Sequence, residues 1–488
     1  MPPGSRSLVD KLKSGDAPQS PLVVVANRLP VARSGDSWKR ASGGLVTALA
    51  PIMERAKGAW IGWDDGSSGV PANVPDLSMK IVPVPLERAL VNGYYHGFSN
   101  RTIWPLFHDL IQPPRFERTW WRHYQEANEH FARATIKQLK KMGPDATVWI
   151  HDYHLMLVPQ MIRSKVEARI LFFLHIPFPP PELFSRLPWR GAILEGLLGA
   201  DVVGFHTDRY RKNFVRTCGR VLPDTQASGA RVALPDGRMV NSSAHAISID
   251  AQEFADAATT DRVKQEVETL RRQFAGKKVM LGVDRLDYTK GIPERLEAFE
   301  QLLEERSDLR GEIVLVQIAV PSRASVREYR ELRGRVEQSV GRINGRFTEP
   351  GGDVPVHFLH RPVSRDRLVA YYSLADVMVI TPLKDGMNLV AKEYVTCQGA
   401  VGGSGVLVLS EFTGAALELK GAVSCNPFDV DGLARALEVA LELDPAEARK
   451  RMGTMARRVT KHDVHRWAAE MLADAGSSKR ALPAEAHL

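Results

Sequence analysis

Short apolar runs alternate with longer amphipathic stretches along most of this chain. Several runs are apolar throughout, such as LVVVA at 22–26 and KVMLGV at 278–283, which is typical of parallel strands covered on both faces. Helical patterns lie between the runs, for example at 119–142 and 295–306. The runs with the length and residue content of strands are 22–26, 59–63, 80–84, 147–151, 169–175, 201–206, 245–249, 278–283, 312–320, 356–359, 377–381 and 405–410.

This alternation predicts an α/β protein with doubly wound parallel sheets. About twelve strands exceed what one open sheet holds comfortably, so we expect two Rossmann-like domains. The break is expected near 249–260, where SIDAQEFADAATTD separates two strand–helix series. The predicted organisation is a disordered tail at 1–20, an N-terminal domain at 21–250, a second domain at 251–460 and a C-terminal helical segment at 461–488.

Composition and charge narrow the class of protein. The chain has 488 residues, 44% hydrophobic and 25% charged, which is ordinary for a globular protein. The net charge is +8, but bases and acids are interspersed, which argues against a nucleic-acid-binding tail. An anionic small-molecule substrate fits this charge, and so does the absence of any specific partner. The three cysteines stand far apart without a CxxC motif, which fits a reducing compartment. No apolar leader and no apolar run of about 18 residues is present, so we expect a cytoplasmic protein without membrane association.

The segment GVDRLDYTKG at 282–291 places Arg285 and Lys290 where a predicted strand ends and a helix begins. Ligands of open parallel sheets bind outside the carboxyl ends of the strands. Pro293 suits the first turn of the following helix, and two cations beside a helix N-terminus form an anion site. The alternative is that Arg285 pairs with Asp287 and Lys290 is solvated.

A second segment, TPLKDGMNLVAKEYV at 381–395, follows the strand predicted at 377–381. Asp385 begins a turn, and a helix is expected to start near Asn388. The backbone N–H groups of residues 387–389 would then point toward a ligand and could hold a diphosphate or sugar hydroxyls. Glu393, one turn into the helix, suits a ribose diol, although a first-turn glutamate also suits the helix dipole alone.

The N-terminal half carries a matching set of polar groups at predicted strand ends. A lone member of this set is usually structural, but recurrence at several strand tips favours a site. Tyr95 and Trp104, in YYHGFSNRTIWP at 94–105, are either core residues or a platform for a sugar. The pair Gly43 and Gly44 in SGGL opens an apolar helix and allows close backbone approach to a ligand. The groups at strand ends are Arg28 in NRLP, Asp152 in HDYH and His175 in HIPFPP.

Together these stretches resemble the trehalose-6-phosphate synthase family, which are retaining glucosyltransferases of the two-Rossmann-domain type called GT-B. The resemblance runs from about residue 21 to 470 and rests on ANRLP, SGGL, FSNRTIWPLFH, HDYHLMLVP, HIPFPP, GVDRLDYTKG and DGMNLVAKEYV in the family's order. It implies transfer of glucose from a nucleotide sugar to glucose 6-phosphate, with UDP-glucose as the usual donor and ADP-glucose as the alternative. The product would be α,α-trehalose 6-phosphate, and the reaction would be the first step of trehalose biosynthesis. It also implies an active site in the inter-domain cleft, a last helix that returns to the N-terminal domain, and a homo-oligomer, either dimer or tetramer.

The resemblance assigns roles to matching positions. The catalytic residues would be Asp152, His175, Arg285 and Lys290. The donor-binding residues would be Gly44, Arg285, Lys290, Asp385, Met387, Asn388, Leu389, Val390 and Glu393. The acceptor-binding residues would be Arg28, Tyr95, Trp104, Asp152 and Arg323, with the arginines on the 6-phosphate.

The sequence DVD at 429–431 has the D-x-D form of a metal site, but Asp429 is better explained as a helix N-cap and Asp431 as a first-turn acid. We therefore expect no metal and no cofactor, with Arg285 and Lys290 stabilising the leaving diphosphate. No carboxylate is clearly a glycosidase-type nucleophile, and the resemblance suggests front-face attack instead. Two alternatives stay open: another phosphorylated acceptor such as glycerol 3-phosphate, and a non-catalytic subunit that senses sugar phosphates.

Overall fold

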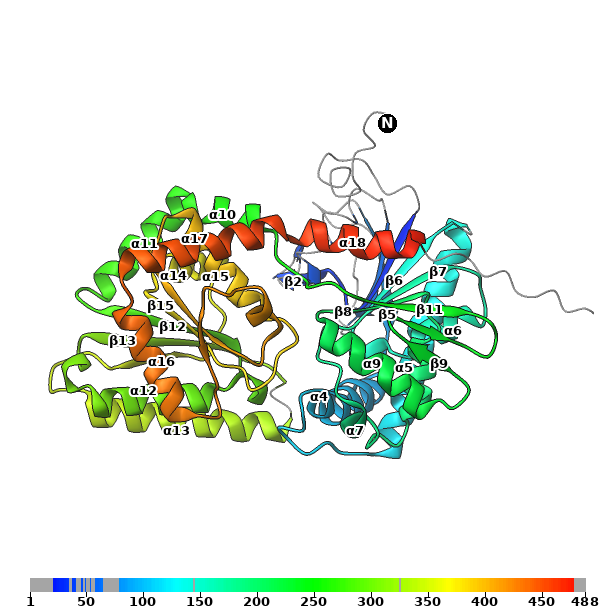
Figure 1. Cartoon of the computed structure of the whole chain (residues 1–488), viewed down its shortest axis with the longest axis horizontal. Helices are drawn as coiled ribbons and strands as arrows, with labels where there is room; N and C mark the ends of the chain where they lie inside the picture. The colour runs from blue at the N-terminus through cyan, green and yellow to red at the C-terminus, as the bar shows by residue number, and fades with distance from the viewer. Residues whose placement is uncertain are drawn as a thin grey trace, which may run out of the picture. The chain divides into compact units, whose positions relative to one another are not determined.

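The chain folds into two compact units (Figure 1). The first unit comprises Met1–Ile247 and Val464–Leu488, and the second comprises Ser248–Asp463. The computed structural model describes residues 21–34, 37–40, 45, 46, 49, 53, 58–64, 79–143, 145–323 and 326–477. The chain thus leaves the first unit at Ile247 and returns to it at Val464 with helix α18 (Val464–Ser477).

The first unit is built on a nine-stranded sheet with the order β5-β4-β1-β6-β7-β8-β11-β10-β9. Neighbours are parallel from β5 to β11, and the last two pairs, β11 with β10 and β10 with β9, are antiparallel. The strands are β1 (Leu22–Arg28), β4 (Ala59–Asp64), β5 (Lys80–Pro85), β6 (Thr147–His151), β7 (Arg169–Phe173), β8 (Val202–Phe205), β9 (Gln226–Ser228), β10 (Arg231–Ala233) and β11 (Met239–Ala244). A separate hairpin pairs β2 (Val31–Ser34) with β3 (Ser37–Arg40).

Helices cover this sheet because its central strands are apolar on both faces. All residues of β6 and β8, and all of β1 except Arg28, are buried. Helix α5 packs on β1, β4 and β5, and α18 packs on β7 and β8. The helices of this unit, besides α18, are α3 (Arg88–Val91), the π-helix η1 (Asn92–Ile103), α4 (Trp104–Phe107), α5 (Arg118–Met142), η2 (Tyr153–Leu155), α6 (Val158–Arg163), α7 (Pro181–Phe184), α8 (Arg190–Leu197) and α9 (Asp208–Val221).

The second unit is built on a six-stranded parallel sheet with the order β14-β13-β12-β15-β16-β17. Its strands are β12 (Lys278–Arg285), β13 (Ile313–Val320), β14 (Val356–Leu359), β15 (Val377–Ile380), β16 (Val406–Ser410) and β17 (Val423–Cys425). Helices α12, α13 and α16 pack together on one face of the sheet, and α10, α11, α14, α15 and α17 pack together on the other (Figure 1).

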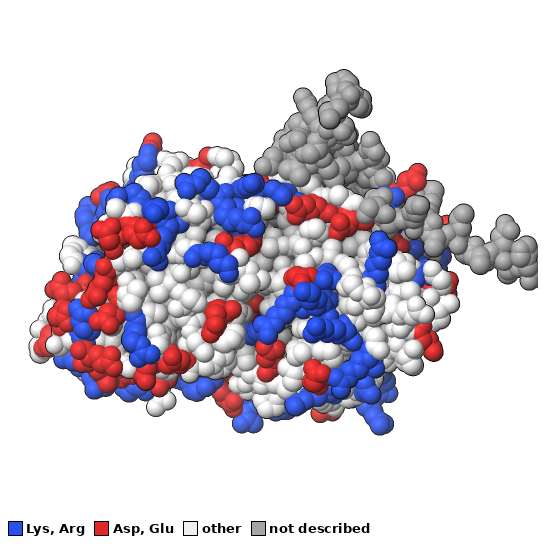
Figure 2. All heavy atoms as spheres, viewed as in Figure 1, with Lys and Arg blue, Asp and Glu red and all other residues white. Residues whose placement is uncertain are grey.

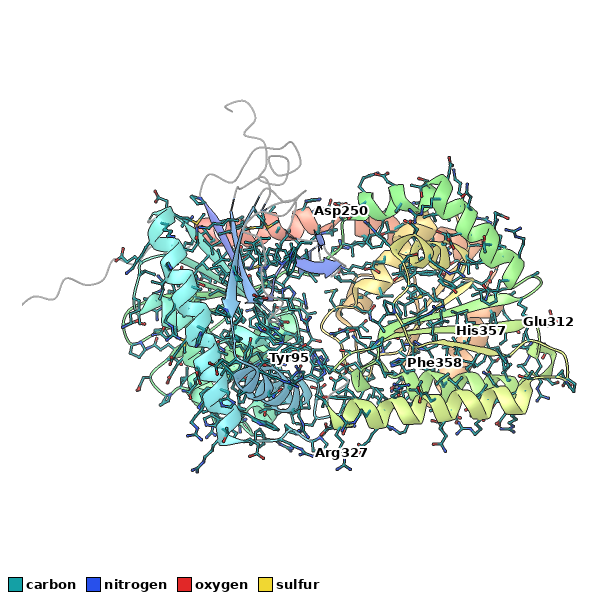
Figure 3. All side chains as sticks on the ribbon, turned by 180° about the vertical axis from the view of Figure 1, so that it is seen from behind. Tyr95, Asp250, Glu312, Arg327, His357 and Phe358 are labelled. Carbon is teal, nitrogen blue, oxygen red and sulfur yellow. The ribbon has the colours of Figure 1, made fainter. Side chains whose placement is uncertain are left out.

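The helices of the second unit begin and end as follows. They are α10 (Ala251–Thr259), α11 (Asp261–Gln273), η3 (Tyr288–Lys290), α12 (Ile292–Glu305), η4 (Ser307–Leu309), α13 (Arg327–Phe347), α14 (Arg365–Leu374), α15 (Leu389–Ala400), η5 (Gly414–Leu417), α16 (Val430–Glu442) and α17 (Pro445–Lys461). Asp250, labelled in Figure 3, caps the first of them by accepting a hydrogen bond from the backbone N–H of Glu253 at 3.0 Å.

The predicted α/β class with two Rossmann-like parallel sheets is confirmed, and so are the strand positions except one. The strand predicted at 245–249 is wrong, because those residues are irregular and the pairing segment is β11 just before them. Residues Asn241 to Ala244 of β11 pair with Val202 to Phe205 of β8. The sequence MVNSSA is too polar to stand out as a strand, whereas Ile247 and Ile249 are buried without belonging to one.

The distribution of charged side chains and the apolar character of the helices bear on the predicted charge pattern and on the predicted lack of membrane association. On the face drawn in Figure 2, Lys and Arg side chains are interspersed with Asp and Glu. Within the described residues, no helix combines the length and the apolar character that crossing a membrane takes.

Candidate active site

Each unit has one place where the strand order reverses. In the first unit the chain order runs outward from β1 to β4 and β5 on one side and from β6 to β7 and β8 on the other, so the reversal lies between β1 and β6. In the second unit it lies between β12 and β15. Ligands of doubly wound sheets bind outside the carboxyl ends of the strands at such a switch point. Arg28 and Arg285 are the last residues of β1 and β12, and Asp152 and Asp385 follow β6 and β15.

The loop after β12 is folded around the carboxylate of Asp287, which is fully buried. Its Oδ1 accepts hydrogen bonds from the Thr289 backbone N–H at 3.1 Å and from the Thr289 hydroxyl at 2.9 Å. Its Oδ2 lies 2.9 Å from Nη1 of Arg323 and 3.0 Å from the hydroxyl of Tyr329. Burial alone would raise the pKa of Asp287, but three neighbouring cations, Arg323 first among them, lower it to about 2. Arg285 is one of the three, yet the hydrogen bonds of this carboxylate go to the other residues.

Lys290, which follows in the same loop, is paired rather than solvated. Its Nζ lies 2.6 Å from Oδ2 of Asp385, and the two side chains are 13% and 15% exposed. The backbone N–H of Leu383 donates to the carbonyl oxygen of Thr289 at 2.8 Å. The loops that follow β12 and β15 are therefore joined both through main chain and through a half-buried ion pair.

A buried arginine at the start of α12 forms hydrogen bonds with residues next to the same two loops. Arg295 is fully buried, and its Nη1 donates to Asp284 at 2.8 Å and to Gln317 at 2.7 Å, while its Nε donates to the Thr381 hydroxyl at 3.1 Å. Gly291 has φ +61°, and a Cβ there would lie 2.0 Å from the carbonyl oxygen of Thr381. Only glycine permits this approach, so the position of Lys290 depends on Gly291 next to it.

The start of α15 has the form expected for a ligand-binding helix end. Asn388 is the N-cap, with φ +82°, and its Oδ1 accepts a hydrogen bond from the Ala391 backbone N–H at 3.0 Å. Its Nδ2 donates to Oδ2 of Asp385 at 3.2 Å, so Asp385 is shared between Asn388 and Lys290. Met387 is buried, and Leu389 and Val390 are half-buried in the first turn. The helix therefore begins at the residue predicted, with its first N–H groups beside the Lys290 loop.

Glu393 lies one turn into α15 and is held by Tyr372. The tyrosine hydroxyl donates to Oε2 of Glu393 at 2.8 Å. Burial raises the pKa of the Glu393 carboxyl, and this hydrogen bond opposes the rise. The second carboxylate oxygen keeps its capacity to accept further hydrogen bonds, as contact with a diol requires.

In the first unit, Arg28 is the last residue of β1 and lies among aromatic rings. Its guanidinium carbon is 5.7 Å from the ring centroid of Tyr95 and 6.0 Å from that of Trp63, and its Nη2 is 3.4 Å from the Tyr95 hydroxyl. Tyr95 belongs to η1 (Figure 3), and its ring stacks on that of His154 with centroids 5.6 Å apart. Arg28 is exposed, and its guanidinium contacts the two rings through cation–π interactions at the surface.

Trp104, a further predicted residue of this unit, is buried, whereas the predicted Gly44 is not described by the structure. Trp104 is 5% exposed and packs its ring on His108 and Tyr153, with centroids 4.1 and 5.6 Å away. The structure therefore favours the core interpretation of its ring over the platform. Gly44 lies outside the described residues.

Asp152 and His175 follow adjacent strands, β6 and β7, and contact each other. The backbone N–H of His175 donates to Oδ1 of Asp152 at 3.3 Å. Asp152 has φ +76°, a conformation that is unfavourable for a non-glycine residue and that tends to persist at functional sites. Burial, with smaller contributions from His151 and His206, places the pKa of His175 well below its ordinary value, so this histidine is neutral.

The predicted residues thus form two groups. Arg285, Lys290, Asp385, Met387, Asn388, Leu389, Val390 and Glu393 all belong to the second unit, and Arg28, Tyr95, Trp104, Asp152 and His175 all belong to the first. Arg323, predicted beside the acceptor, belongs to the second unit and has φ +47° and a side chain 3% exposed against Asp287.

Asp429 begins the D-x-D stretch at 429–431, and its predicted role as a helix N-cap is confirmed. Its Oδ1 accepts a hydrogen bond from the backbone N–H of Gly432 at 2.9 Å at the start of α16. Asp431 lies in the first turn and accepts from the side chain of Gln301 at 2.9 Å. The D-x-D stretch therefore has a local structural explanation.

Sequence reasoning missed the groups that hold the site residues in place. Asp287 stands inside the GVDRLDYTKG motif, but its partners Arg323 and Tyr329 come from a distant segment that the motif does not reveal. His151 and His206, which contact His175, do end predicted strands, and that position was an available signal.

The sequence pattern of glycosyltransferase family 20 matches residues 20–477 of this chain. The trehalose-6-phosphate synthase of Mycolicibacterium gilvum (strain PYR-GCK) is 47% identical over 506 aligned residues, which cover 98% of each chain. A solved UDP-forming α,α-trehalose-phosphate synthase from Burkholderia xenovorans, in complex with glucose-6-phosphate, is 35% identical with a TM-score of 0.85 and covers 94% of this chain and 100% of that one. An E. coli structure bound with UDP-2-fluoro glucose is 34% identical with a TM-score of 0.86 and covers 95% and 100%. This chain is therefore a glycosyltransferase that belongs to family 20, together with the trehalose-6-phosphate synthases.

Proposed function

We propose that this enzyme transfers glucose from UDP-glucose to the anomeric hydroxyl of glucose 6-phosphate, with retention, and releases UDP and α,α-trehalose 6-phosphate. The named relatives support this proposal, since the Burkholderia enzyme is UDP-forming and was solved with glucose-6-phosphate, and the E. coli structure holds a UDP-glucose analogue. The observation that carries it is the meeting of Lys290, Asp385 and the start of α15 at the switch point of the second unit.

The donor's diphosphate would bind at this meeting point. Lys290 would exchange its contact with Asp385 for a phosphate oxygen, and Arg285, exposed at the end of β12, would add a second positive charge. The free N–H groups at the N-terminus of α15 attract the same anion. As the glycosidic bond breaks, negative charge grows on the leaving diphosphate, and fixed cations there stabilise the transition state more than the ground state. Glu393 would accept hydrogen bonds from the ribose.

The acceptor's phosphate would bind Arg28, because a guanidinium offers a two-pronged contact to phosphate oxygens. Tyr95 holds this guanidinium from the side and presents a hydroxyl next to it. Asp152 would accept a hydrogen bond from a sugar hydroxyl. His175 would act beside it as a neutral hydrogen-bonding group, since its pKa is low.

The experiment compares donors and acceptors with the purified full chain. UDP-, ADP- and GDP-glucose are each incubated with glucose 6-phosphate, and nucleotide release is followed while the product is identified by mass and by the anomeric couplings in its NMR spectrum. The expected result is turnover fastest with UDP-glucose and a product with both linkages α. Faster turnover with ADP-glucose would contradict the base assignment. Turnover with glycerol 3-phosphate in place of glucose 6-phosphate would favour the alternative acceptor.

We further propose that turnover needs no divalent metal. The support is that Asp429 serves as an N-cap and that Arg285 and Lys290 supply charge where a metal would act. Enzyme treated with EDTA and passed into metal-free buffer should keep full activity, and activity lost by EDTA and restored by Mg²⁺ or Mn²⁺ would contradict this. The expected cytoplasmic location and homo-oligomeric state rest on composition and family resemblance, and light scattering of the purified chain tests the second.

A further inference from the structure

The last residue of β6, His151, is fully buried in an aromatic cluster of the first unit. Its ring centroid lies 4.8 Å from that of Trp149, 5.3 Å from that of His175 and 6.5 Å from that of Trp467. Trp467 comes from α18, the helix with which the chain returns to this unit, and it also packs edge-on against Phe173 with centroids 5.1 Å apart. The cluster therefore encloses one side of His175, a residue expected at the reacting sugars.

The two histidines share one hydrogen bond. Nδ1 of His151 lies 3.1 Å from Nε2 of His175. Burial lowers the pKa of His151 to about 3, and burial is also the main reason that the pKa of His175 is low. Both rings are therefore neutral near pH 7 and each carries a single N–H. One ring must donate and the other accept, so the proton positions on the two rings are coupled.

The surroundings of the other nitrogen of His151 decide which ring donates. Nε2 of His151 is buried and has no hydrogen-bond partner among the described residues. The indole N–H groups of Trp149 and Trp467, in the same cluster, are likewise buried without an acceptor in the described part of the chain. The described residues thus supply no acceptor for a proton on this nitrogen. A proton on it would create a third buried N–H without an acceptor, which is less favourable than a lone pair.

We propose that His151 is a positioning residue that fixes the tautomer of His175: it carries its proton on Nδ1, donates it to Nε2 of His175, and so places the His175 proton on Nδ1. This inference rests on the proposed function, in which His175 contacts a sugar. Nδ1 of His175 makes no hydrogen bond with the residues that the structure describes, and the residue is half-buried. In this tautomer His175 meets a substrate oxygen as a donor, which suits a hydroxyl or ring oxygen.

The backbone of His175 is fixed independently of its ring. Nε2 of His206 lies 3.1 Å from the His175 carbonyl oxygen and must donate to it, and the His175 N–H donates to Asp152. With the backbone held at both ends, the proton position on the ring is the property left for His151 to set. This separation supplies a control, because the hydrogen bond of His206 goes to the His175 carbonyl oxygen, while its ring meets the His175 ring only edge-on, with centroids 5.5 Å apart.

The first test reads the tautomers directly in the full chain. In perdeuterated protein with ¹⁵N-labelled histidine, two-bond ¹H–¹⁵N correlations distinguish a ring nitrogen that bears a proton from one that does not, and single variants assign the signals. We expect the proton of both His151 and His175 on Nδ1. A proton on Nε2 of His175 in the wild-type enzyme would overturn the proposal, whatever the variants do.

The second test uses three substitutions at one position. His151→Asn keeps an N–H close to the place of Nδ1, so His175 should stay in the Nδ1–H form and kcat should stay within about threefold of wild type. His151→Asp offers only an acceptor, so the His175 proton should move to Nε2 and kcat should fall roughly tenfold or more, with a smaller change in KM. His151→Leu removes the partner and should fall between the two.

The controls separate positioning from packing and from the proposed function. His206→Gln keeps a donor to the His175 carbonyl and should leave the His175 tautomer unchanged. Melting temperatures show whether a variant is merely unstable, and equal kcat in folded His151→Asn and His151→Asp would overturn the proposal. Failure of the wild-type enzyme to transfer glucose from any nucleotide donor would refute the proposed function, while the tautomer spectra would still report on His151.

Discussion

The two switch points hold their polar groups in different electrostatic states. In the second unit the cations are compensated by carboxylates, with Lys290 on Asp385 and Arg323 on Asp287. In the first unit the exposed Arg28 rests on the aromatic rings of Tyr95 and Trp63. Among the described residues, Arg28 forms no ion pair with a carboxylate.

If both places bind a phosphate as proposed, the difference gives two ways of preparing such a site. Lys290 would give up part of its contact with Asp385 when an anion binds, so the gain on binding would be reduced by the lost pair. Arg28 loses no carboxylate, so its full charge is available, but fewer contacts fix its side chain. Under the proposed function, the second unit would supply fixed charge during bond breaking and the first would capture a charged acceptor.

Removing a cation of the second unit should have the largest effect. Lys290→Ala and Arg285→Ala should each lower kcat by roughly 10²–10³, by analogy with loss of a group that stabilises developing negative charge. The KM for glucose 6-phosphate should change little. Steady-state kinetics with both substrates varied measures the split.

Lys277→Ala is the matched control for those two variants. Lys277 lies in the second unit just before β12 and forms an ion pair with Asp353 at 2.7 Å, away from the carboxyl end of the strand. It should keep wild-type kcat. Full activity in Lys290→Ala or Arg285→Ala would refute the assignment of that residue to the leaving diphosphate.

Asp385→Asn tests whether Asp385 only neutralises Lys290. The substitution keeps the shape and removes the charge that holds Nζ at 2.6 Å. If Asp385 also contacts the donor sugar, kcat should fall about tenfold to a hundredfold, the range for a hydrogen bond to a charged group. UDP alone should bind at least as tightly as to wild type in calorimetry, because Lys290 is released. A variant with unchanged kcat would leave Asp385 as a counter-ion only.

Much of this arrangement is predictable from sequence because motifs are local. The strand ends that carry Arg28, Asp152, Arg285 and Asp385 follow from apolar runs that stop at polar residues. The start of α15 at Asn388 likewise follows from the turn before it. Local pattern was sufficient wherever a strand is apolar and a helix has a polar cap.

The remainder depends on contacts between distant segments. The pairing of Lys290 with Asp385 joins residues 95 positions apart, and that of Asp287 with Tyr329 joins residues 42 apart. Apolar periodicity does not tell whether Trp104 is buried, because its segment forms a π-helix followed by one short turn. The polar strand β11 was missed because its stability comes from pairing with β8 and not from its own composition.

Arg28→Ala should have a smaller effect, confined to the acceptor. We expect KM for glucose 6-phosphate to rise roughly tenfold, the lower end for a charge-assisted contact at an exposed site, with little change in the donor KM. Arg28→Lys keeps the charge but loses the planar fork and should fall between. Arg220→Ala, which removes an exposed arginine of α9 paired with Glu182, is the control. Equal loss of affinity for donor and acceptor would mean that Arg28 is structural.

The smallest effect concerns a histidine whose pKa is shifted in the direction opposite to that of His175 in the same unit. Nε2 of His245, just after β11, lies 2.7 Å from Asp474 and its Nδ1 lies 3.3 Å from Glu470, both on α18. Arg466 also contacts Glu470, at 2.7 Å. Burial alone would lower the pKa of His245, but the hydrogen bond and charge of Asp474, together with Glu470, raise it above its ordinary value. Burial would likewise raise the pKa of Asp474, and His245 lowers it.

The sign of the pH dependence follows from these two shifts. The contribution of His245 is complete below its unfolded pKa of about 6.5 and is lost as pH rises through its higher folded pKa. The contribution of Asp474 is present above about pH 4 and is lost as pH falls through its lower folded pKa. Wild type should therefore gain about 1 kcal/mol or less, seen as a rise of about 2 °C in Tm, between pH 8 and pH 5.5 relative to His245→Gln, which keeps a hydrogen bond without the charge. Identical pH dependence of Tm in wild type and His245→Gln would show that the histidine is not charged in the folded enzyme, and the contrast with His175 would disappear.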